Sequence, residues 1–274
     1  MSNLLVRLFG WKATLHHGDP LVWDRWRWIT KRLRETRHVE RLLDVGCGSG
    51  AFTIGTAKLG YKSTGLSWDE RNQKTAELRA RIVGAKSASF EICDVRELDQ
   101  KPQYVGSFDV VLCTENIEHI LDDFRLMRAM AACLKPGGRL LLTSPYIRRR
   151  PWSSMDYGPF PAEENGAHVR RGYNQSMLVE MCTNAGLMVE EISHVSGPVS
   201  VLGAYVMVRL QKLHWSIGWL AILPLRPLPP LIDRWLGPLI GTTPFSIGLE
   251  AMKPRLLNKT ATAAAAATRV CEAA

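Results

Sequence analysis

The chain has 274 residues, of which 46% are hydrophobic and 22% charged, and its formal net charge is +9. This length and composition exclude a disordered protein and predict one large domain, or one domain with an insertion. The six cysteines are scattered without a CxxC pair, so they indicate reduced thiols and a cytoplasmic protein. The opening MSNLLVRLFGWK has only a short apolar run, broken by Arg7, and predicts no secretory signal.

Basic residues gather in three places, namely Arg25 to Arg41, Arg148 to Arg150, and Arg170 with Arg171. Such clusters suit nucleic acid, anionic lipid headgroups or a phosphorylated substrate. A solvated basic face explains each cluster taken alone equally well. Charge therefore leaves the partner open.

The first expected element is a helix that begins after Asp19 as its N-cap and Pro20 at its first position. Apolar residues then follow at helical spacing to about Arg37. Further on, Ser67 with Glu70 forms a capping-box pattern for a helix that is expected to reach about Val83.

Short apolar runs alternate with amphipathic segments from residue 39, which predicts an α/β fold with a doubly wound, mostly parallel, seven-stranded Rossmann-like sheet. Ligands bind such a sheet at the carboxyl ends of its strands. The expected strands are RLLDVG at 41–46, KSTGL at 62–66, SFEIC at 89–93, FDVVLC at 108–113, RLLLTS at 139–144, LMVEEIS at 187–193 and an edge strand within 243–255.

The chain divides into five parts on this interpretation. They are an N-terminal helical segment at 1–38, the α/β core at 39–195, an apolar Pro-rich helical excursion or cap at 196–243, the final strand at 244–254 and an Ala-rich tail at 255–274, for which we expect disorder.

A glycine-rich turn, DVGCGSG, follows the first expected strand and opens the next helix. Glycine permits a tight turn and lets the backbone approach a ligand closely. An ordinary glycine turn is the simplest interpretation. Gly46, Gly48 and Ala51 also satisfy the loose GxGxxA form of a dinucleotide-binding fingerprint, which leaves an oxidoreductase as an alternative.

Four signals in the expected order decide between these interpretations: DVGCGSG, then Cys93-Asp94, then FDVVLCTENIEH, then LKPGGRLLLTSP. With them, residues 42–192 resemble the class I, Rossmann-like S-adenosylmethionine methyltransferases. The similarity implies a methyltransferase that binds S-adenosyl-L-methionine.

The resemblance assigns cofactor roles position by position. Asp44 and the backbone of Gly46, Cys47 and Gly48 are expected to hold the methionine portion. Trp68 is expected to stack on the adenine, and the alternative is a core aromatic. Asp94 accepts from the adenine amino group and Val95 offers its N–H. The family usually carries an acidic residue where Ser67 stands, so Ser67 and Asn72 are expected to share the ribose contacts.

The segment TENIEH places Glu115, Glu118 and His119 just beyond the fourth strand. Its ExxEH pattern resembles the ubiquinone-biosynthesis O-methyltransferases and the small-RNA 2′-O-methyltransferases. In those families such residues, with a later histidine in the second group, can bind a divalent metal. His168 is the candidate later histidine. We take His119, Glu115 and His168 as the catalytic candidates and favour a histidine base over Mg²⁺.

The excursion contains two apolar runs, each shorter than the roughly 20 residues that cross a bilayer. It is a buried cap, a hydrophobic acceptor pocket or an interfacial segment with Trp215, Trp219 and Trp235 at the headgroup level. We therefore expect methyl transfer to a small, lipophilic acceptor, most plausibly at oxygen, and peripheral contact with the inner face of a membrane. The alternatives are an RNA 2′-O-methyltransferase, with nucleic acid the less favoured partner, and a non-catalytic membrane-associated protein of this fold.

Overall fold

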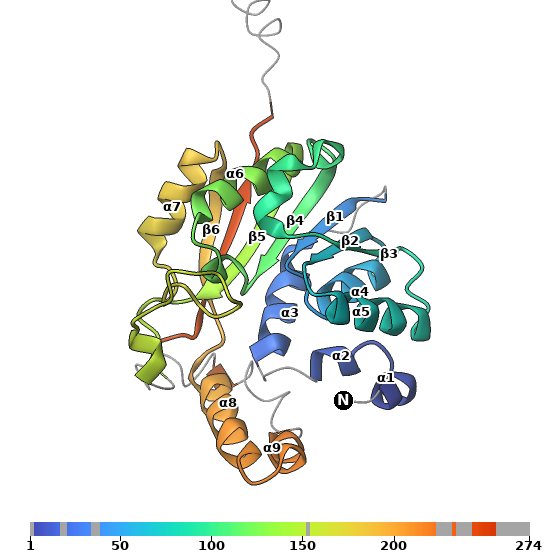
Figure 1. Cartoon of the computed structure of the whole chain (residues 1–274), viewed down its shortest axis with the longest axis vertical. Coiled ribbons are helices and arrows are strands. Elements are labelled where there is room, and N and C mark those ends of the chain that lie inside the picture. The colour runs from blue at the N-terminus through green and yellow to red at the C-terminus, as the bar shows by residue number, and fades with distance from the viewer. Residues whose placement is uncertain are drawn as a thin grey trace, which may run out of the picture.

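The computed structural model describes residues 3–16, 21–33, 39–151, 154–222, 232–233 and 243–255. A seven-stranded sheet forms the centre of this part of the chain, in the order β3-β2-β1-β4-β5-β7-β6 (Figure 1). Its strands are β1 (Arg41–Val45), β2 (Lys62–Ser67), β3 (Ala88–Ile92), β4 (Phe108–Thr114), β5 (Leu134–Pro145), β6 (Met188–Val195) and β7 (Ser246–Met252). The predicted α/β class and mostly parallel sheet are confirmed.

The chain reverses its direction of travel across the sheet between β1 and β4, which pair in parallel. Ligands bind at such a switch point in doubly wound folds. The helices α4 (Ala51–Lys58) and α5 (Glu70–Ile82) contact β1, β2 and β3, while α6 (Asp123–Cys133) and α7 (Gln175–Asn184) contact β4 to β7. The fold therefore presents the ends of β1 and β4 as its expected site.

The sequence predicted that the last strand forms an edge of the sheet. This prediction is wrong. β7 pairs antiparallel with β5 on one side and with β6 on the other. Its burial pattern gives the reason, because six of its seven positions are buried, including Ile247, Leu249 and Ala251. β3 and β6 form the two edges of the sheet instead.

The predicted capping box at the start of α5 is also wrong. Asp69 is the N-cap, and its side chain accepts from the backbone N–H groups of Arg71 and Asn72. Ser67 instead accepts from the N–H of Asp69 at 3.3 Å. A carboxylate next to the helix start is the better partner for those N–H groups, because it also complements the helix dipole. Gly84 ends the helix region with a φ of +63°, as expected.

The opening helix is present as α3 (Leu21–Arg32), and two shorter helices precede it, α1 (Asn3–Phe9) and α2 (Ala13–His16). The predicted cap at Asp19 and Pro20 lies outside the described residues, as does the predicted end at Arg37. Figure 1 shows α1 and α2 in the lower part of the view, while α3 rises from there and packs against the sheet.

The excursion contains two described helices, α8 (Pro198–Gln211) and α9 (Trp215–Ile222), which pack against each other. None of the helices in the described part of the chain is long and apolar enough to cross a membrane. The side chains of Trp215 and Trp219, all of Trp235 and the tail after Arg255 lie outside the described residues.

Trp28 fixes α3 against the far half of the sheet. Its indole Nε1 donates to Ser193 Oγ of β6 at 2.8 Å, and its ring occupies the place of a side chain at Gly248. A Cβ on Gly248 would lie 2.6 Å from the ring. Glycine at this position of β7 is therefore what allows α3 to pack closely on the sheet.

We expect Gly248→Ala to destabilise the fold by about 1–3 kcal/mol, because the anchored indole must move to admit a methyl group. Gly203→Ala in α8 is the matched control, since a Cβ there meets no atom within 4 Å. That change should stabilise by about 0.5–1 kcal/mol through helix propensity. Denaturant unfolding measures both. Equal effects of the two substitutions would contradict the packing described for Trp28.

Candidate functional site

The glycine turn joins β1 to α4 and is held in a left-handed conformation. Gly46, Gly48 and Gly50 have φ values of +82°, +51° and +80°. The backbone N–H groups of Gly46 and Cys47 donate to Leu66 O of β2, at 3.1 and 2.8 Å. The turn is thereby fixed across the carboxyl ends of two neighbouring strands.

The three glycines serve different purposes. A Cβ on Gly46 would lie 2.4 Å from Asn116 Cγ, and one on Gly50 would lie 2.7 Å from Ala76. At Gly48 a Cβ would meet no described atom within 4 Å. From the sequence, we expected all three glycines to leave room for a ligand. The structure shows that protein atoms require two of these glycines, while Gly48 alone faces open space.

Asp44 is fully buried at the end of β1. Thr53 Oγ1 donates to its Oδ2 at 2.6 Å, while Oδ1 is buried without a hydrogen-bond partner among the described residues. Burial raises the pKa of Asp44 to about 6, and the bond from Thr53 opposes this only in part. A buried carboxylate with one oxygen free fits an ammonium group such as that of a methionine moiety. Thr53 is a partner that the sequence analysis missed.

Two residues expected at the ribose and one expected at the adenine lie at or just beyond the end of β2, the strand next to β1. Ser67 is buried, and Asn72 is half-buried in the first turn of α5. Trp68 is 66% exposed, which rules out the alternative of a core aromatic. An exposed indole directly beyond a strand end remains suited to stacking on a base.

Asp94, beyond β3, is already engaged by the protein. It accepts from Arg96 through the backbone N–H and through the guanidinium, whose Nε lies 2.9 Å from each carboxylate oxygen. These bonds hold the pKa of Asp94 below its usual range. Arg96 also donates to Glu164 at 2.7 Å, and Glu164 accepts from the N–H of Leu121. Val95 is buried beside it.

This chain of contacts ties the long segment after β5 to the corner expected to hold adenine. A hollow of about 270 Å³ lies there, lined by Arg96, Ile120, Leu121, Asp122, Arg125, Leu126 and Glu164. Glu164 could not be predicted from the sequence, since a lone glutamate in an irregular segment belongs to no pattern. The adenine corner and the segment over β4 therefore share one ion-pair network.

Two glutamates of the ExxEH segment have different partners. Glu115 directly follows β4 with a φ of +48°, a conformation that a residue other than glycine rarely adopts. Arg25 of α3 lies against it, with 3.3 Å between Nε and Oε1, and both side chains are largely buried. The helix α3 thus reaches the ExxEH segment, a contact that the sequence did not predict.

Glu118, His119 and His168 form the cluster at the end of β4. One ligand atom from each lies within 4.8 Å of the others. The two imidazole rings meet edge to face, with centroids 4.6 Å apart. Glu118 is fully buried and accepts from Ser144 Oγ at 3.0 Å, while its Oε1 lies 4.0 Å from His168 Nε2. Of the three catalytic candidates, the structure brings His119 and His168 together, and places Glu115 with Arg25.

Burial sets the charge of this cluster. Burial and the neighbouring Glu115 raise the pKa of Glu118 well above its usual range. The pKa of His168 falls to about 4, chiefly because of burial and secondarily because of its neighbours His119 and Arg149. His168 is therefore neutral near pH 7 and can offer a lone pair, either to a proton or to a metal ion.

The chain is similar in sequence to known methyltransferases. The family model described as a methyltransferase domain matches residues 18–192. The ubiquinone biosynthesis O-methyltransferase of Marinobacter nauticus is 35% identical over 186 residues, which cover 65% of this chain and 74% of that protein. The chain belongs to this methyltransferase family. It is an S-adenosylmethionine-dependent methyltransferase, so the oxidoreductase interpretation of Gly46, Gly48 and Ala51 is wrong.

Solved structures show the same fold. Phosphoethanolamine N-methyltransferase 2 of Haemonchus contortus, in complex with S-adenosyl-L-methionine, has a TM-score of 0.59 at 20% identity, over 85% of this chain and 53% of that chain. The cyclase SpnF has a TM-score of 0.60 at 20% identity, over 85% and 82%. Because one of these proteins is named as a cyclase, the shared fold alone does not define the reaction of this methyltransferase.

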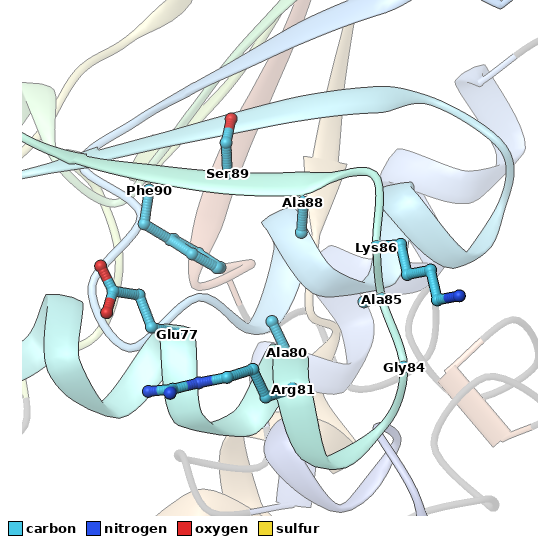
Figure 2. A pocket seen from close by; sticks show the side chains of 9 residues that line it. All are labelled: Glu77, Ala80, Arg81, Gly84, Ala85, Lys86, Ala88, Ser89 and Phe90. Atoms are coloured by element: carbon cyan, nitrogen blue, oxygen red, sulfur yellow. The ribbon is translucent and has the colours of Figure 1, made fainter.

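A second hollow lies away from the methyltransferase site, between α5 and the edge strand β3 (Figure 2). It has a volume of about 540 Å³ and is lined by Glu77, Ala80, Arg81, Gly84, Ala85, Lys86, Ala88, Ser89 and Phe90. Figure 2 shows Phe90 pointing from β3 toward α5. Its ring lies so near Gly50 that a Cβ there would be 2.8 Å from Phe90 Cε1. No expected site residue lines this hollow, so its size does not make it the cofactor site.

We expect Gly48→Asn to lower the affinity of the methyltransferase for S-adenosylhomocysteine at least about tenfold, since a side chain would fill the open space beside Asp44. Asparagine tolerates the left-handed backbone, so the fold should persist. Gly84→Asn is the control, because Gly84 has a φ of +63° and equally open surroundings at the end of α5. Titration calorimetry measures both. Equal affinities in the two variants would show that the turn does not hold the cofactor.

We expect Asp94→Ala to weaken the binding of S-adenosylhomocysteine by about 1–3 kcal/mol, through loss of the acceptor for the adenine amino group. Asp99→Ala provides the control, because Asp99 forms a comparable pair with Arg125 nearby. The control removes the acidic partner of another arginine that lines the same hollow, but it leaves Asp94 and its acceptor oxygens in place. If both variants bind as tightly as the wild type, the adenine lies elsewhere.

Proposed function

We propose that this methyltransferase transfers a methyl group to a hydroxyl oxygen of a lipophilic quinone precursor, with His119 accepting the hydroxyl proton. The names of the relatives support the acceptor class. The cluster of Glu118, His119 and His168 at the end of β4 supports the chemistry. That cluster is the observation on which the proposal depends.

Residues of the chain fit both halves of the reaction. The open space at Gly48 and the free oxygen of Asp44 fit the methionine end of S-adenosylmethionine, which supplies an electrophilic methyl group when bound. Asn116 packs against Gly46, and His119 comes three residues later. The acceptor is thus proposed to lie between the glycine turn and the histidine.

His119 is proposed to take the proton as the oxygen–carbon bond forms. Its Nδ1 is buried and has no hydrogen-bond partner among the described residues, so a lone pair or a proton is available there. The neighbouring Glu118 would stabilise the imidazolium that results, because a positive charge beside it favours the ionised form of its carboxyl group. A base of this kind raises the nucleophilicity of the hydroxyl while the protein excludes water.

A divalent cation such as Mg²⁺ is the second candidate for the same cluster. The free Oε1 of Glu118 and the free Nδ1 of His119 are both buried, and His168 is neutral near pH 7. One carboxylate and two imidazoles are a recognised donor set for divalent transition-metal ions, whereas Mg²⁺ prefers oxygen ligands. A bound ion would lower the pKa of the acceptor hydroxyl. Glu115 would then balance Arg25 without binding the ion.

We also propose that the enzyme works in the cytoplasm at the inner face of a membrane, because a lipophilic acceptor partitions into the bilayer. The RNA 2′-O-methyltransferase interpretation has less support, since the relatives reported above are named for ubiquinone biosynthesis. The N-terminal segment at 1–38, the core at 39–195, the excursion at 196–243 and the strand at 244–254 remain our proposed division of the chain.

We expect His119→Ala to reduce turnover by about 10²–10⁴-fold and to leave the affinity for S-adenosylhomocysteine nearly unchanged, since the base acts on the acceptor alone. His194→Ala is the control, because His194 is exposed near the end of β6 and contacts Tyr146. The assay uses a prenylated dihydroxyphenol as the acceptor and S-adenosylmethionine with a labelled methyl group. The label in the methylated product is measured after extraction into an organic solvent. Full activity of His119→Ala across neutral pH would contradict both the base and the metal.

Chelation separates the two mechanisms in the same assay. Loss of activity in EDTA with recovery in Mg²⁺ indicates the metal, and indifference to EDTA indicates the unaided histidine. Incorporation of label into RNA, with none into any hydroxylated aromatic acceptor, would contradict the proposed acceptor class.

A further inference from the structure

Residues 168–173 lie against η3 (Ile117–His119), the short turn that carries Glu118 and His119. The backbone N–H of Val169 donates to Glu118 O at 3.0 Å. η3 is a single 3₁₀ turn, and such turns have poorer hydrogen-bond geometry than an α-helix. Contacts from the later segment therefore help to fix its conformation.

Arg170 binds the chain immediately after this turn. Its Nη2 donates to Ile120 O at 2.7 Å and to Leu121 O at 2.8 Å. Nη1 of the same guanidinium pairs with the carboxylate of Asp123, at the start of α6. One side chain thus joins two carbonyls and a carboxylate that follow His119, through donors in a fixed planar arrangement.

Tyr173 adds contacts from the other side of the turn. It is fully buried, and its hydroxyl donates to Asp123 Oδ2 at 2.8 Å and lies 3.3 Å from Ile117 O. Asp123 is buried as well, so its carboxylate accepts from both Tyr173 and Arg170. We refer to Asp123, Arg170 and Tyr173 as the clamp.

The far end of the segment is joined to the sheet. The N–H of Tyr173 donates to Pro145 O at 2.9 Å, and the N–H of Ile147 donates to Tyr173 O at 3.0 Å. A Cβ on Gly172 would collide with Pro145 O, so glycine is needed for this close approach. The clamp is therefore fixed to the end of β5.

These contacts act on the two imidazoles of the site. The rings of His119 and His168 meet edge to face, with 4.6 Å between their centroids. Arg170 lies two residues after His168, and it binds the carbonyls one and two residues after His119. The clamp thus links the backbone beside one ring to the backbone beside the other.

We propose that Asp123, Arg170 and Tyr173 are positioning residues of this methyltransferase, which hold the ring of His168 against the ring of His119. In the described part of the chain, the cluster of possible ligand atoms contains none of the three, so they act through the histidines. The inference deepens the proposed function and rests on it for the role of the histidines in methyl transfer.

The first test is steady-state kinetics of Arg170→Ala with the prenylated dihydroxyphenol as acceptor. We expect kcat to fall at least about tenfold, because a displacement of about 1 Å near the reacting groups can cost about 100-fold. The KM for S-adenosylmethionine should be nearly unchanged, since the clamp acts on the histidines. Millimolar guanidinium ion should restore part of the activity, because the lost side chain is 24% exposed and the ion can take its place beside Asp123.

Arg27→Ala is the matched control. Arg27 pairs with Asp24 on α3 at 2.6 Å, and its side chain is 29% exposed, close to the exposure of Arg170. This variant should keep the wild-type kcat and should not respond to guanidinium.

Tyr173→Phe provides a second variant, which removes one hydroxyl and keeps the buried ring, so it should fold even if Arg170→Ala does not. It should also lower kcat. Nuclear magnetic resonance of protein labelled with ¹⁵N in its histidine rings gives a readout besides activity. The signals of His168, assigned with His168→Gln, should shift in both clamp variants and stay in place in Arg27→Ala.

The outcomes separate this inference from the proposed function. Wild-type kcat in both clamp variants overturns the inference, as do His168 signals that stay in place in both. An equal loss of kcat in Arg27→Ala overturns it too, because the effect would not be specific to the clamp. If the wild type methylates no hydroxylated acceptor, the proposed function is contradicted instead, and the His168 signals still test the clamp.

Discussion

The close approach of four strand ends at the glycine turn is the constraint on which the rest of this structure depends. Gly46 leaves room for Asn116 beyond β4, and Gly50 leaves room for Ala76 of α5 and Phe90 of β3. A side chain at either position would push one of these elements away. The corner proposed for the cofactor and the histidine cluster lie close together because the turn between them has no side chain at those two positions.

The carboxyl groups of the candidate site are buried, and their charges are balanced to different extents. Arg25 lies against Glu115 and moderates the field at Glu118, which has no arginine or lysine partner of its own among the described residues. An unpaired buried carboxylate is costly, and such cost is tolerated where a ligand later relieves it. Asp44 and Glu118 each have one buried oxygen without a hydrogen-bond partner among the described residues. Both are therefore interpreted as sites prepared for positive charge.

Local sequence signals were sufficient for the strands, the glycine turn and the neighbourhood of His119, because each is encoded within a few residues. The signals failed where the deciding contact is remote in sequence. Nothing near Ser246 reveals that β7 inserts between β5 and β6, and nothing near Glu115 reveals Arg25 ninety residues earlier. The cap of α5 was misassigned for another reason, because Ser67 and Asp69 both have suitable oxygens and only the backbone geometry distinguishes them.

The ladder between β6 and β7 has a consequence for how this enzyme can change. Val195 and Ser246 are direct partners in the sheet, so the whole excursion between them is the connection of a β-hairpin. The entropic penalty of closing a connection rises only as the logarithm of its length, so a long insertion there costs little more than a short turn. The excursion is in this sense an interchangeable module. It can be lengthened, shortened or replaced while the catalytic sheet keeps its register.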